Sequence, residues 1–399
     1  MKTLVLNSGS SSIKYSLFEM DDQSVLAAGV IESIGGSHSL HRYKIGSDSA
    51  ISQTLALADH AQGLHTLFSG LQHNAILQDA AELFCIGHRV VHGGELFRQP
   101  VIIDSRVTEK ISELSALAPL HNPANVQGIQ QALNEFGSVP QVAVFDTAFH
   151  QTLPQHAYHY ALPRSWYDDF AIRRYGFHGT SHYYVAKKAA EHLARPLAEL
   201  NLITLHLGNG CSITAIENGK SVDTSMGMTP MEGLMMGTRC GDIDPALSFY
   251  VERIAGLSSA EIEQLLNRSS GLKGVCGEND MRAVHRLAES GDQQAQLALD
   301  MFAYRIKKYL GAYFAVLGKV DAIVFTGGIG ENDSWLRAQC CANLAALGIA
   351  IDEEKNTSAR AECLDISARQ QAVAVLVIRT NEELEIALQS VDCVLNGGS

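Results

Sequence analysis

Two short segments of small polar residues in this chain could bind phosphate. Residues 7–12 (NSGSSS) lie between expected strands at 3–6 and 15–18. Residues 208–210 (GNG) lie in the same way between expected strands at 202–207 and 212–216. A tight hairpin of this kind can direct backbone amides and hydroxyls towards an anion. Because one occurs in each half of the chain, we expect a duplicated fold with a ligand between the halves.

Two arginines next to glycines are candidates for binding negative charge. Arg89 follows Gly87-His88, and Arg239 follows Gly237-Thr238. Glycine-rich backbone allows a ligand to approach closely, and guanidinium groups bind carboxylates and phosphates with bidentate geometry. Taken singly, each arginine is better explained as a solvated or salt-bridged side chain. Together they favour a site for a carboxylate and a phosphate.

Other polar residues stand where an α/β sheet places its chemistry. Asp146 directly follows the expected strand at 142–145, and ligands of open α/β sheets bind beyond the carboxyl ends of strands. The pairs His88/His92 and His178/His182 have metal-like spacing, but the zincin pattern also needs a glutamate after the first histidine. Arg89 and Gly179 occupy those places, so we do not expect zinc.

The elements that position these residues alternate along the chain. Further strands are expected at 83–86 and 322–325, and helices at 125–135, 180–193, 283–317 with interruptions, and 334–347. Alternation of this kind indicates an α/β class. Residues 223–245 have little periodicity, and long irregular loops are usually functional. Residues 380–383 (TNEE) form a capping-box pattern that opens a last helix.

The motifs together resemble those of the acetate kinase family, in the same order along the chain. They are the segments 7–14 (NSGSSSIK), 87–94 (GHRVVHGG), 177–182 (FHGTSH), 206–210 (HLGNG), 237–245 (GTRCGDIDP), 328–332 (GIGEN) and 380–383 (TNEE). The resemblance covers essentially the whole chain. It departs from the family pattern at Cys211 and at Asp333, where a serine is common, and neither touches the expected chemistry.

The resemblance implies a fold shared with sugar kinases, heat-shock chaperone ATPases and actin. Two duplicated ribonuclease-H-like lobes would enclose a nucleotide cleft. The first lobe would comprise residues 1–148, completed by a final helix at 382–399, and the second would comprise 149–381. The resemblance also implies a homodimer.

The implied reaction is reversible phosphoryl transfer from ATP to acetate, giving ADP and acetyl phosphate. Arg89 would bind the carboxylate, and Asp146, His178 and Arg239 would be catalytic. The methyl pocket would be lined by Val91, Leu120, Phe177 and Pro230. ATP would contact Lys14, His206, Leu207, Gly208, Asn209, Gly210, Asp280, Met281, Arg282, Gly328, Ile329, Gly330, Glu331 and Asn332. Asn7 and Glu382 would hold the sphere of Mg²⁺, which Mn²⁺ can replace.

Asp146 is not expected to be a general base, because a carboxylic acid with a pKa of roughly 4–5 is already ionised near pH 7. We expect it to organise Mg²⁺, its waters or the neighbouring arginine.

Three other activities fit the same fold. A sugar or glycerol kinase would need polar groups for hydroxyls, whereas Arg89 has apolar neighbours. A chaperone-type or actin-type ATPase would lack a carboxylate pocket. The nearest alternative is a propionate or butyrate kinase of the same family. Val91 favours acetate, because propionate-preferring members tend to have a smaller residue at the matching position. In an extended strand Val91 would share a face with Arg89.

The composition indicates which binding partners and which cellular compartment to expect. The net charge of −13 opposes binding to nucleic acid or anionic lipid, so neither partner is expected. The longest apolar stretch, 372–378, is strand-sized, and the apolar run at 3–6 is too short for a signal peptide. The eight cysteines are scattered without a CxxC pair, which favours reduced thiols and a cytoplasmic location.

Overall fold

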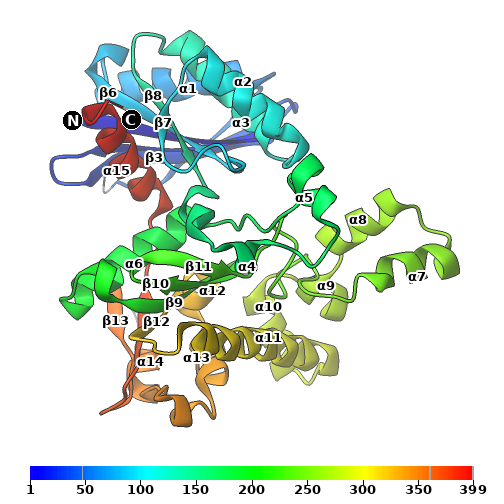
Figure 1. Ribbon diagram of the computed structural model, residues 1–399. Helices are drawn as coiled ribbons and strands as arrows, with labels where there is room; N and C mark the ends of the chain where they lie inside the picture. Colours follow the sequence, from blue (N-terminus) through cyan, green and yellow to red (C-terminus); the bar gives the residue numbers. More distant parts are fainter. Residues whose placement is uncertain (47, 359–360, 398–399) are drawn as a thin grey trace. The chain divides into compact units, whose positions relative to one another are not determined.

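The computed structural model describes residues 1–46, 48–358 and 361–397, and the chain forms two compact units (Figure 1). Unit 1 comprises Met1–Phe149 and Asn381–Ser399, and unit 2 comprises His150–Thr380. The divisions expected from the sequence were at 148/149 and 381/382. Residues 398 and 399 of the expected final segment lie outside the described residues.

Unit 1 is built on a mixed sheet with the order β5-β4-β3-β2-β1-β6-β8-β7. Strands β1 to β5 are joined by antiparallel pairing, β1, β6 and β8 are parallel, and β7 is antiparallel to β8. The strands are β1 (Lys2–Gly9), β2 (Ser12–Glu19), β3 (Ser24–Glu32), β4 (Ser39–Ile45), β5 (Ile51–Leu55), β6 (Leu83–Val90), β7 (Val101–Ile102) and β8 (Gln141–Phe145).

Helices cover both faces of this sheet (Figure 1). They are α1 (His60–His73), α2 (Ser105–Glu113), α3 (Asn122–Glu135) and α15 (Glu382–Leu395), with 3₁₀ turns at Ala80–Glu82 and Leu114–Ala116. Glycines let helices approach closely: a Cβ on Gly128 of α3 would meet Ser8, and one on Gly87 of β6 would meet Ile386 and Ser390 of α15. Successive strand residues face opposite sides, so Ser8 faces α3, whereas Gly87 and Arg89 face α15.

Unit 2 repeats the central pairing of unit 1. Its sheet has the order β11-β10-β9-β12-β14-β13, with antiparallel β11-β10-β9, parallel β9-β12-β14 and antiparallel β13. The strands are β9 (Asn201–Leu207), β10 (Cys211–Glu217), β11 (Lys220–Thr224), β12 (Ala322–Thr326), β13 (Cys363–Asp365) and β14 (Ala374–Ile378). The predicted α/β fold with two related lobes is therefore confirmed.

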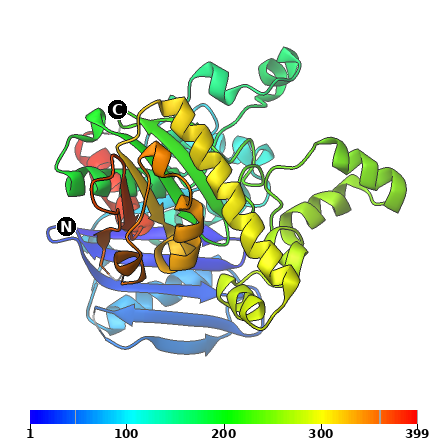
Figure 2. The same ribbon diagram turned by 90° about the horizontal axis from the view of Figure 1, so that it is seen from below.

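The helices of unit 2 also lie on both faces of its sheet. Helix α6 packs on β9, β12 and β14, and the long α11, yellow in Figure 2, crosses β10 and β9. The helices are α4 (Gln155–Tyr158), α5 (Arg164–Phe170), α6 (Gly179–Leu193), α7 (Ala246–Ala255), α8 (Ser259–Arg268), α9 (Gly271–Cys276), α10 (Met281–Glu289), α11 (Gln293–Leu317), α12 (Gly327–Asn332), α13 (Ser334–Cys341) and α14 (Glu353–Thr357), with 3₁₀ turns at Ala148–Thr152, Leu197–Glu199 and Ala345–Leu347.

Several expected boundaries were wrong for local reasons. Helix α3 begins at Asn122 because Pro123 is compatible with a first helical turn. The helix expected at 334–347 ends at Cys341, and a separate 3₁₀ turn follows. The last helix is capped by Asn381, whose side chain accepts from the amide of Leu384, and not by Thr380.

No helix within the described ranges is long and apolar enough to cross a membrane.

Candidate active site

In unit 1, the first hairpin joins the start of the last helix. Asn7 of β1 is directly opposite Lys14 of β2 in the strand register. The Lys14 ammonium forms an ion pair with Glu383, in the first turn of α15. Asn7 is half-buried and Lys14 is exposed. The predicted metal ligands, Asn7 and Glu382, therefore belong to neighbouring elements of one unit.

Arg89 is held by Asp146 in unit 1. Its Nε lies 3.0 Å from Asp146 Oδ1, and its Nη2 lies 2.6 Å from Oδ2, a bidentate arrangement. The Asp146 carboxylate raises the pKa of Arg89, so the guanidinium stays charged. The side chain of Asp146 is 4% exposed, and that of Arg89 is 24% exposed. Among the roles expected for Asp146, the structure shows direct contact with the arginine.

Val91 lies one residue beyond the end of β6 and is half-buried. Its amide donates to Asn125 Oδ1 at 3.1 Å, and Asn125 Nδ2 donates to the Ser8 carbonyl at 2.8 Å. One buried side chain thus ties the turn after Arg89 to the first hairpin. The next residue, His92, is tied through both its amide and its carbonyl to Asn122. Leu120, also in unit 1, is 59% exposed.

In unit 2, His178 precedes helix α6 in a strained conformation. Its φ of 56° is in the left-handed region, which a non-glycine residue adopts only when its surroundings require it. His178 Nδ1 lies 2.9 Å from Ser212 Oγ, and its ring stacks on His206 with centroids 4.3 Å apart. The carbonyl of the buried Phe177 is 2.9 Å from His150 Nε2. These contacts fix the direction of the His178 ring.

Arg239 lies in a stretch, fully described here, without helix or strand between Thr224 and Ala246. Its Nη1 donates to the carbonyl of the half-buried Pro230 at 3.1 Å, and burial lowers its pKa. A Cβ built on Gly210 would lie 3.4 Å from Arg239 Nη1 and 3.5 Å from His178 Nε2. The arginine and the histidine therefore converge on the Gly208–Gly210 turn.

A polar network immobilises this irregular segment. The Asp242 carboxylate accepts from the Gly233 amide at 2.9 Å and from the Tyr309 hydroxyl at 2.7 Å. Arg174 donates to the carbonyls of Thr224, Ser225 and Met226 and pairs with Glu232. The segment that carries Arg239 is thus anchored at several points.

The remaining nucleotide-binding candidates lie in short segments of unit 2. Asp280 caps α10 and pairs with Arg282 at 2.6 Å, both exposed, whereas Met281 is buried. The 328–332 segment is part of helix α12. Glu331 Oε1 accepts from the amides of Gly327 and Thr380, so that oxygen is committed to the backbone.

The site candidates therefore form two groups. Unit 1 carries Lys14, Arg89, Val91, Leu120, Asp146, and the metal candidates Asn7 and Glu382. Unit 2 carries Phe177, His178, His206–Gly210, Pro230, Arg239, Asp280–Arg282 and Gly328–Asn332.

A family model and curated relatives identify the family of the chain. The family model of the acetokinase family matches residues 2–388. The chain belongs to the acetokinase family. An acetate kinase from Oleidesulfovibrio alaskensis is 52% identical over 403 aligned positions, covering all of both chains.

Two solved structures resemble the chain over nearly its whole length. The crystal structure of Porphyromonas gingivalis acetate kinase has a TM-score of 0.95 and 42% identity, covering 98% of this chain and 99% of that one. A propionate kinase from Francisella tularensis has a TM-score of 0.92 and 44% identity, with coverages of 97% and 98%. The predicted family is confirmed. Because one of these relatives is an acetate kinase and the other a propionate kinase, the size of the carboxylic acid is the question to settle for this chain.

The structure also shows supporting residues that the sequence analysis missed. Asn122 and Asn125 fix the backbone after Arg89, and Ser212 contacts His178. The sequence contained one sign that the two asparagines act together, because they lie three residues apart and so share one helix face. Nothing in the sequence alone relates Ser212 to His178, 34 positions away.

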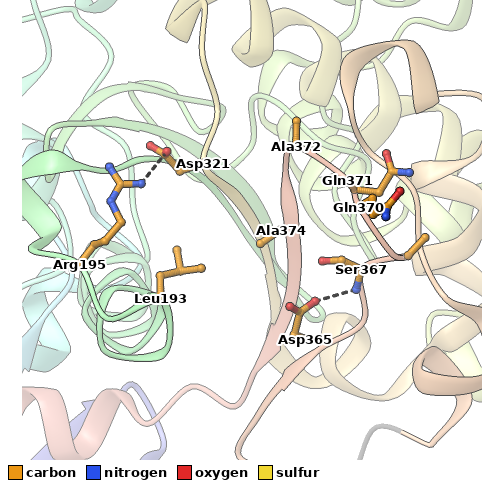
Figure 3. A pocket seen from close by; sticks show the side chains of 10 residues that line it. Leu193, Arg195, Asp321, Asp365, Ser367, Gln370, Gln371, Ala372 and Ala374 are labelled. Atoms are coloured by element: carbon orange, nitrogen blue, oxygen red, sulfur yellow. Dashed lines mark hydrogen bonds and ion pairs between the residues drawn. The ribbon is translucent and has the colours of Figure 1, made fainter.

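A pocket of about 370 Å³ lies on unit 2, away from these residues (Figure 3). Its lining includes Asp321, which precedes β12, and Ala374, which begins β14. Helix α12, which begins at Gly327, follows the opposite, carboxyl end of β12. In the pocket Arg195 pairs with Asp321 at 2.8 Å. The pocket contains none of the predicted site residues.

Proposed function

We propose that this chain transfers the γ-phosphoryl group of ATP to acetate, forming acetyl phosphate and ADP reversibly. The observation that carries the proposal is the bidentate Arg89–Asp146 pair, two residues before Val91 in the sequence. Two of the guanidinium nitrogens of Arg89 are held by Asp146, and Nη1 has no hydrogen-bond partner among the described residues. A cation oriented in this way suits a carboxylate, and Val91, two residues further along the chain, is the candidate for contact with its alkyl end.

In the proposed reaction an acetate oxygen attacks the γ-phosphorus, and the bond from that phosphorus to the ADP oxygen breaks. Charge spreads over the equatorial oxygens of the group in transfer. His178 and Arg239 are the donors that would stabilise this charge, because both converge on the Gly208–Gly210 turn. Such preorganised donors supply a large part of catalysis in phosphoryl transfer.

A divalent cation would offset the repulsion between acetate and the phosphates. Within the described residues, no group of three or more His, Cys, Asp or Glu side chains could hold a metal. Mg²⁺ usually binds one or two protein oxygens and completes its sphere with phosphates and water. The amide oxygen of Asn7 and the carboxylate of Glu382 fit that sparse donor set.

Substitution Val91→Ala is expected to shift the preference towards propionate. The smaller side chain makes room for about one methylene, and pockets discriminate by only ~1–3 kcal/mol per methylene. The ratio of kcat/KM for propionate to that for acetate should rise roughly 5- to 150-fold. Leu120→Ala, a matched apolar truncation in unit 1, tests the second predicted lining residue. An unchanged ratio in folded Val91→Ala protein would remove Val91 from the pocket.

We also propose a homodimer that uses helix α7. Leu247, Tyr250 and Ile254 recur at helical spacing and are 46%, 53% and 64% exposed. A contiguous apolar surface of this kind is typical of protein interfaces.

The double substitution Tyr250→Glu with Ile254→Glu is expected to shift the protein to monomers, because two charges would be buried at the interface. Sedimentation velocity gives the oligomeric state, and Leu395→Glu, at a 63% exposed site in unit 1, is the control. A dimer that persists in the double variant would refute this use of α7.

We place the protein in the cytoplasm, because its eight cysteines are all free thiols.

The proposed activity is tested by trapping acetyl phosphate with hydroxylamine, which gives a hydroxamate. We expect product that requires Mg²⁺, ATP and acetate together, and ADP in equal amount. Propionate, butyrate, glucose and glycerol are the comparison acceptors. Absence of hydroxamate with every acid of two to four carbons would reject the assignment, and ATP turnover without any acceptor would favour an ATPase.

A further inference from the structure

His182 is a fully buried histidine that the proposed reaction does not use. It lies one helical turn after His178, on α6. Its Nδ1 is 2.7 Å from Thr204 Oγ1 of β9, and its Nε2 is 2.7 Å from Ser212 Oγ of β10. Ser212 Oγ is also 2.9 Å from His178 Nδ1. A continuous hydrogen-bonded chain therefore runs from Thr204 through His182 and Ser212 to His178.

The direction of this chain is set at its buried end. A hydroxyl has one hydrogen to donate. Thr204 is fully buried, and among the described residues its hydroxyl has one side-chain partner close enough to be a strong acceptor, His182 Nδ1. A buried hydroxyl hydrogen without an acceptor is costly, so Thr204 donates and His182 Nδ1 accepts.

The remaining hydrogens follow from this first one. Burial lowers the pKa of His182 well below its ordinary value, so its ring is neutral and carries one hydrogen. Since Nδ1 accepts, the hydrogen is on Nε2 and is donated to Ser212 Oγ. The hydroxyl hydrogen of Ser212 is then donated to His178 Nδ1. A neutral His178 that accepts at Nδ1 carries its own hydrogen on Nε2.

The hydrogen bonds of the chain could also run in the opposite direction over the same distances, but one hydroxyl hydrogen would then lack an acceptor among the described residues. His178 Nδ1 would donate to Ser212, Ser212 to His182 Nε2, and His182 Nδ1 to Thr204. The hydrogen of the Thr204 hydroxyl would then have no described acceptor in the interior of the sheet. The first direction satisfies every group in the chain, which is the normal condition of buried polar atoms.

We propose that Thr204, His182 and Ser212 are positioning residues that keep neutral His178 in the tautomer with its hydrogen on Nε2. Nε2 faces the Gly210 turn: it lies 3.5 Å from the position of a Cβ built on Gly210, and Arg239 Nη1 lies 3.4 Å from the same position. His178 then donates a hydrogen bond to the phosphoryl group in transfer, whereas the other tautomer would direct a lone pair at that anion. The role of His178 rests on the proposed function, but the tautomer does not.

The first test reads the tautomer directly and needs no activity. ¹⁵N–¹H correlation spectra of protein labelled at histidine distinguish protonated from unprotonated ring nitrogens, and the His178→Gln and His182→Gln variants assign the signals. We expect hydrogen on Nε2 in both rings. A His178 ring with its hydrogen on Nδ1 in the wild-type protein would overturn the proposal.

The second test removes the first donor of the chain at a distance from the substrate. Thr204→Val keeps the branched shape that suits a strand and lacks the hydroxyl, whereas Thr204→Ser keeps the hydroxyl. We expect Thr204→Val to lower kcat about 10-fold, less than the ~10²–10³-fold loss of a whole donor. KM for ATP and acetate should stay within about twofold, and His178 should show mixed tautomers. Thr204→Ser should restore most of the turnover.

The outcomes separate the two proposals. A folded Thr204→Val protein with wild-type kcat and a single Nε2–H tautomer at His178 would refute the role proposed for the hydrogen-bonded chain from Thr204 to His178. If this variant does not fold, as judged by circular dichroism, the wild-type spectrum still decides. A wild-type protein with the expected tautomers but no acetate-dependent ATP turnover would reject the proposed function, whereas the proposed control of the His178 tautomer would still stand.

Discussion

Replacement of Arg239 by alanine is expected to lower kcat about 10²–10³-fold, the usual loss for one preorganised donor to a transition state. The KM for acetate should change much less. Arg239 lies near His178 at the Gly210 turn, in unit 2, whereas the proposed acetate ligand Arg89 lies in unit 1. Its contact with the transferred group should strengthen as negative charge develops on that group, so the loss of Arg239 should lower kcat.

Two further variants sharpen this expectation. Arg239→Lys keeps the charge but not the planar fork that suits phosphate oxygens, so it should recover only part of the lost turnover. Asp242→Asn leaves Arg239 in place and weakens the anchor of its loop at Gly233. Steady-state kinetics with both substrates measure all three. A large rise in the KM for acetate with normal kcat in Arg239→Ala would show that the roles of Arg239 and Arg89 are exchanged.

The parts of the fold that depend on neighbouring residues could be predicted from the sequence. The two hairpins are formed by short runs of small residues between apolar strands, so the residue pattern alone reveals both hairpins and their repetition. The strand ends at Phe145 and at Thr326 were placed to within about one residue, because each apolar run stops abruptly. The irregularity of 223–245 shows in the sequence as a loss of periodicity.

The supporting contacts could not be predicted, because they join distant parts of the chain. Arg89 and Asp146 are 57 positions apart, and Asn125 and Ser8 are 117 positions apart. Sequence proximity says nothing about such pairs until the order of the strands is known. The ion pair between Lys14 and Glu383 is a further example, because it depends on how α15 returns to the first sheet. The ATP contact that the resemblance implied for Lys14 stays a prediction.

Asp146→Asn is expected to lower kcat/KM for acetate by about 10²-fold, because charge-assisted hydrogen bonds contribute ~1.5–3 kcal/mol each. An asparagine in place of the carboxylate presents a donor to a guanidinium that has only donors to offer. Arg89 would then lose its bidentate partner at 3.0 and 2.6 Å and turn away from the acetate position. The KM for ATP should change little.

The decisive measurement is a double-mutant cycle with Arg89→Ala, Asp146→Asn and the combined variant. If Asp146 acts by orienting Arg89, the losses should be far from additive, since its removal matters little once the arginine is absent. Additive losses would instead indicate that Asp146 acts separately, for example on the metal sphere. The pH dependence tests a third role, that of general base, which we do not expect because acetate is already ionised near pH 7, with a pKa of roughly 4–5 for such acids. Raising the pH should therefore not restore Asp146→Asn, and full recovery at high pH would identify Asp146 as a general base.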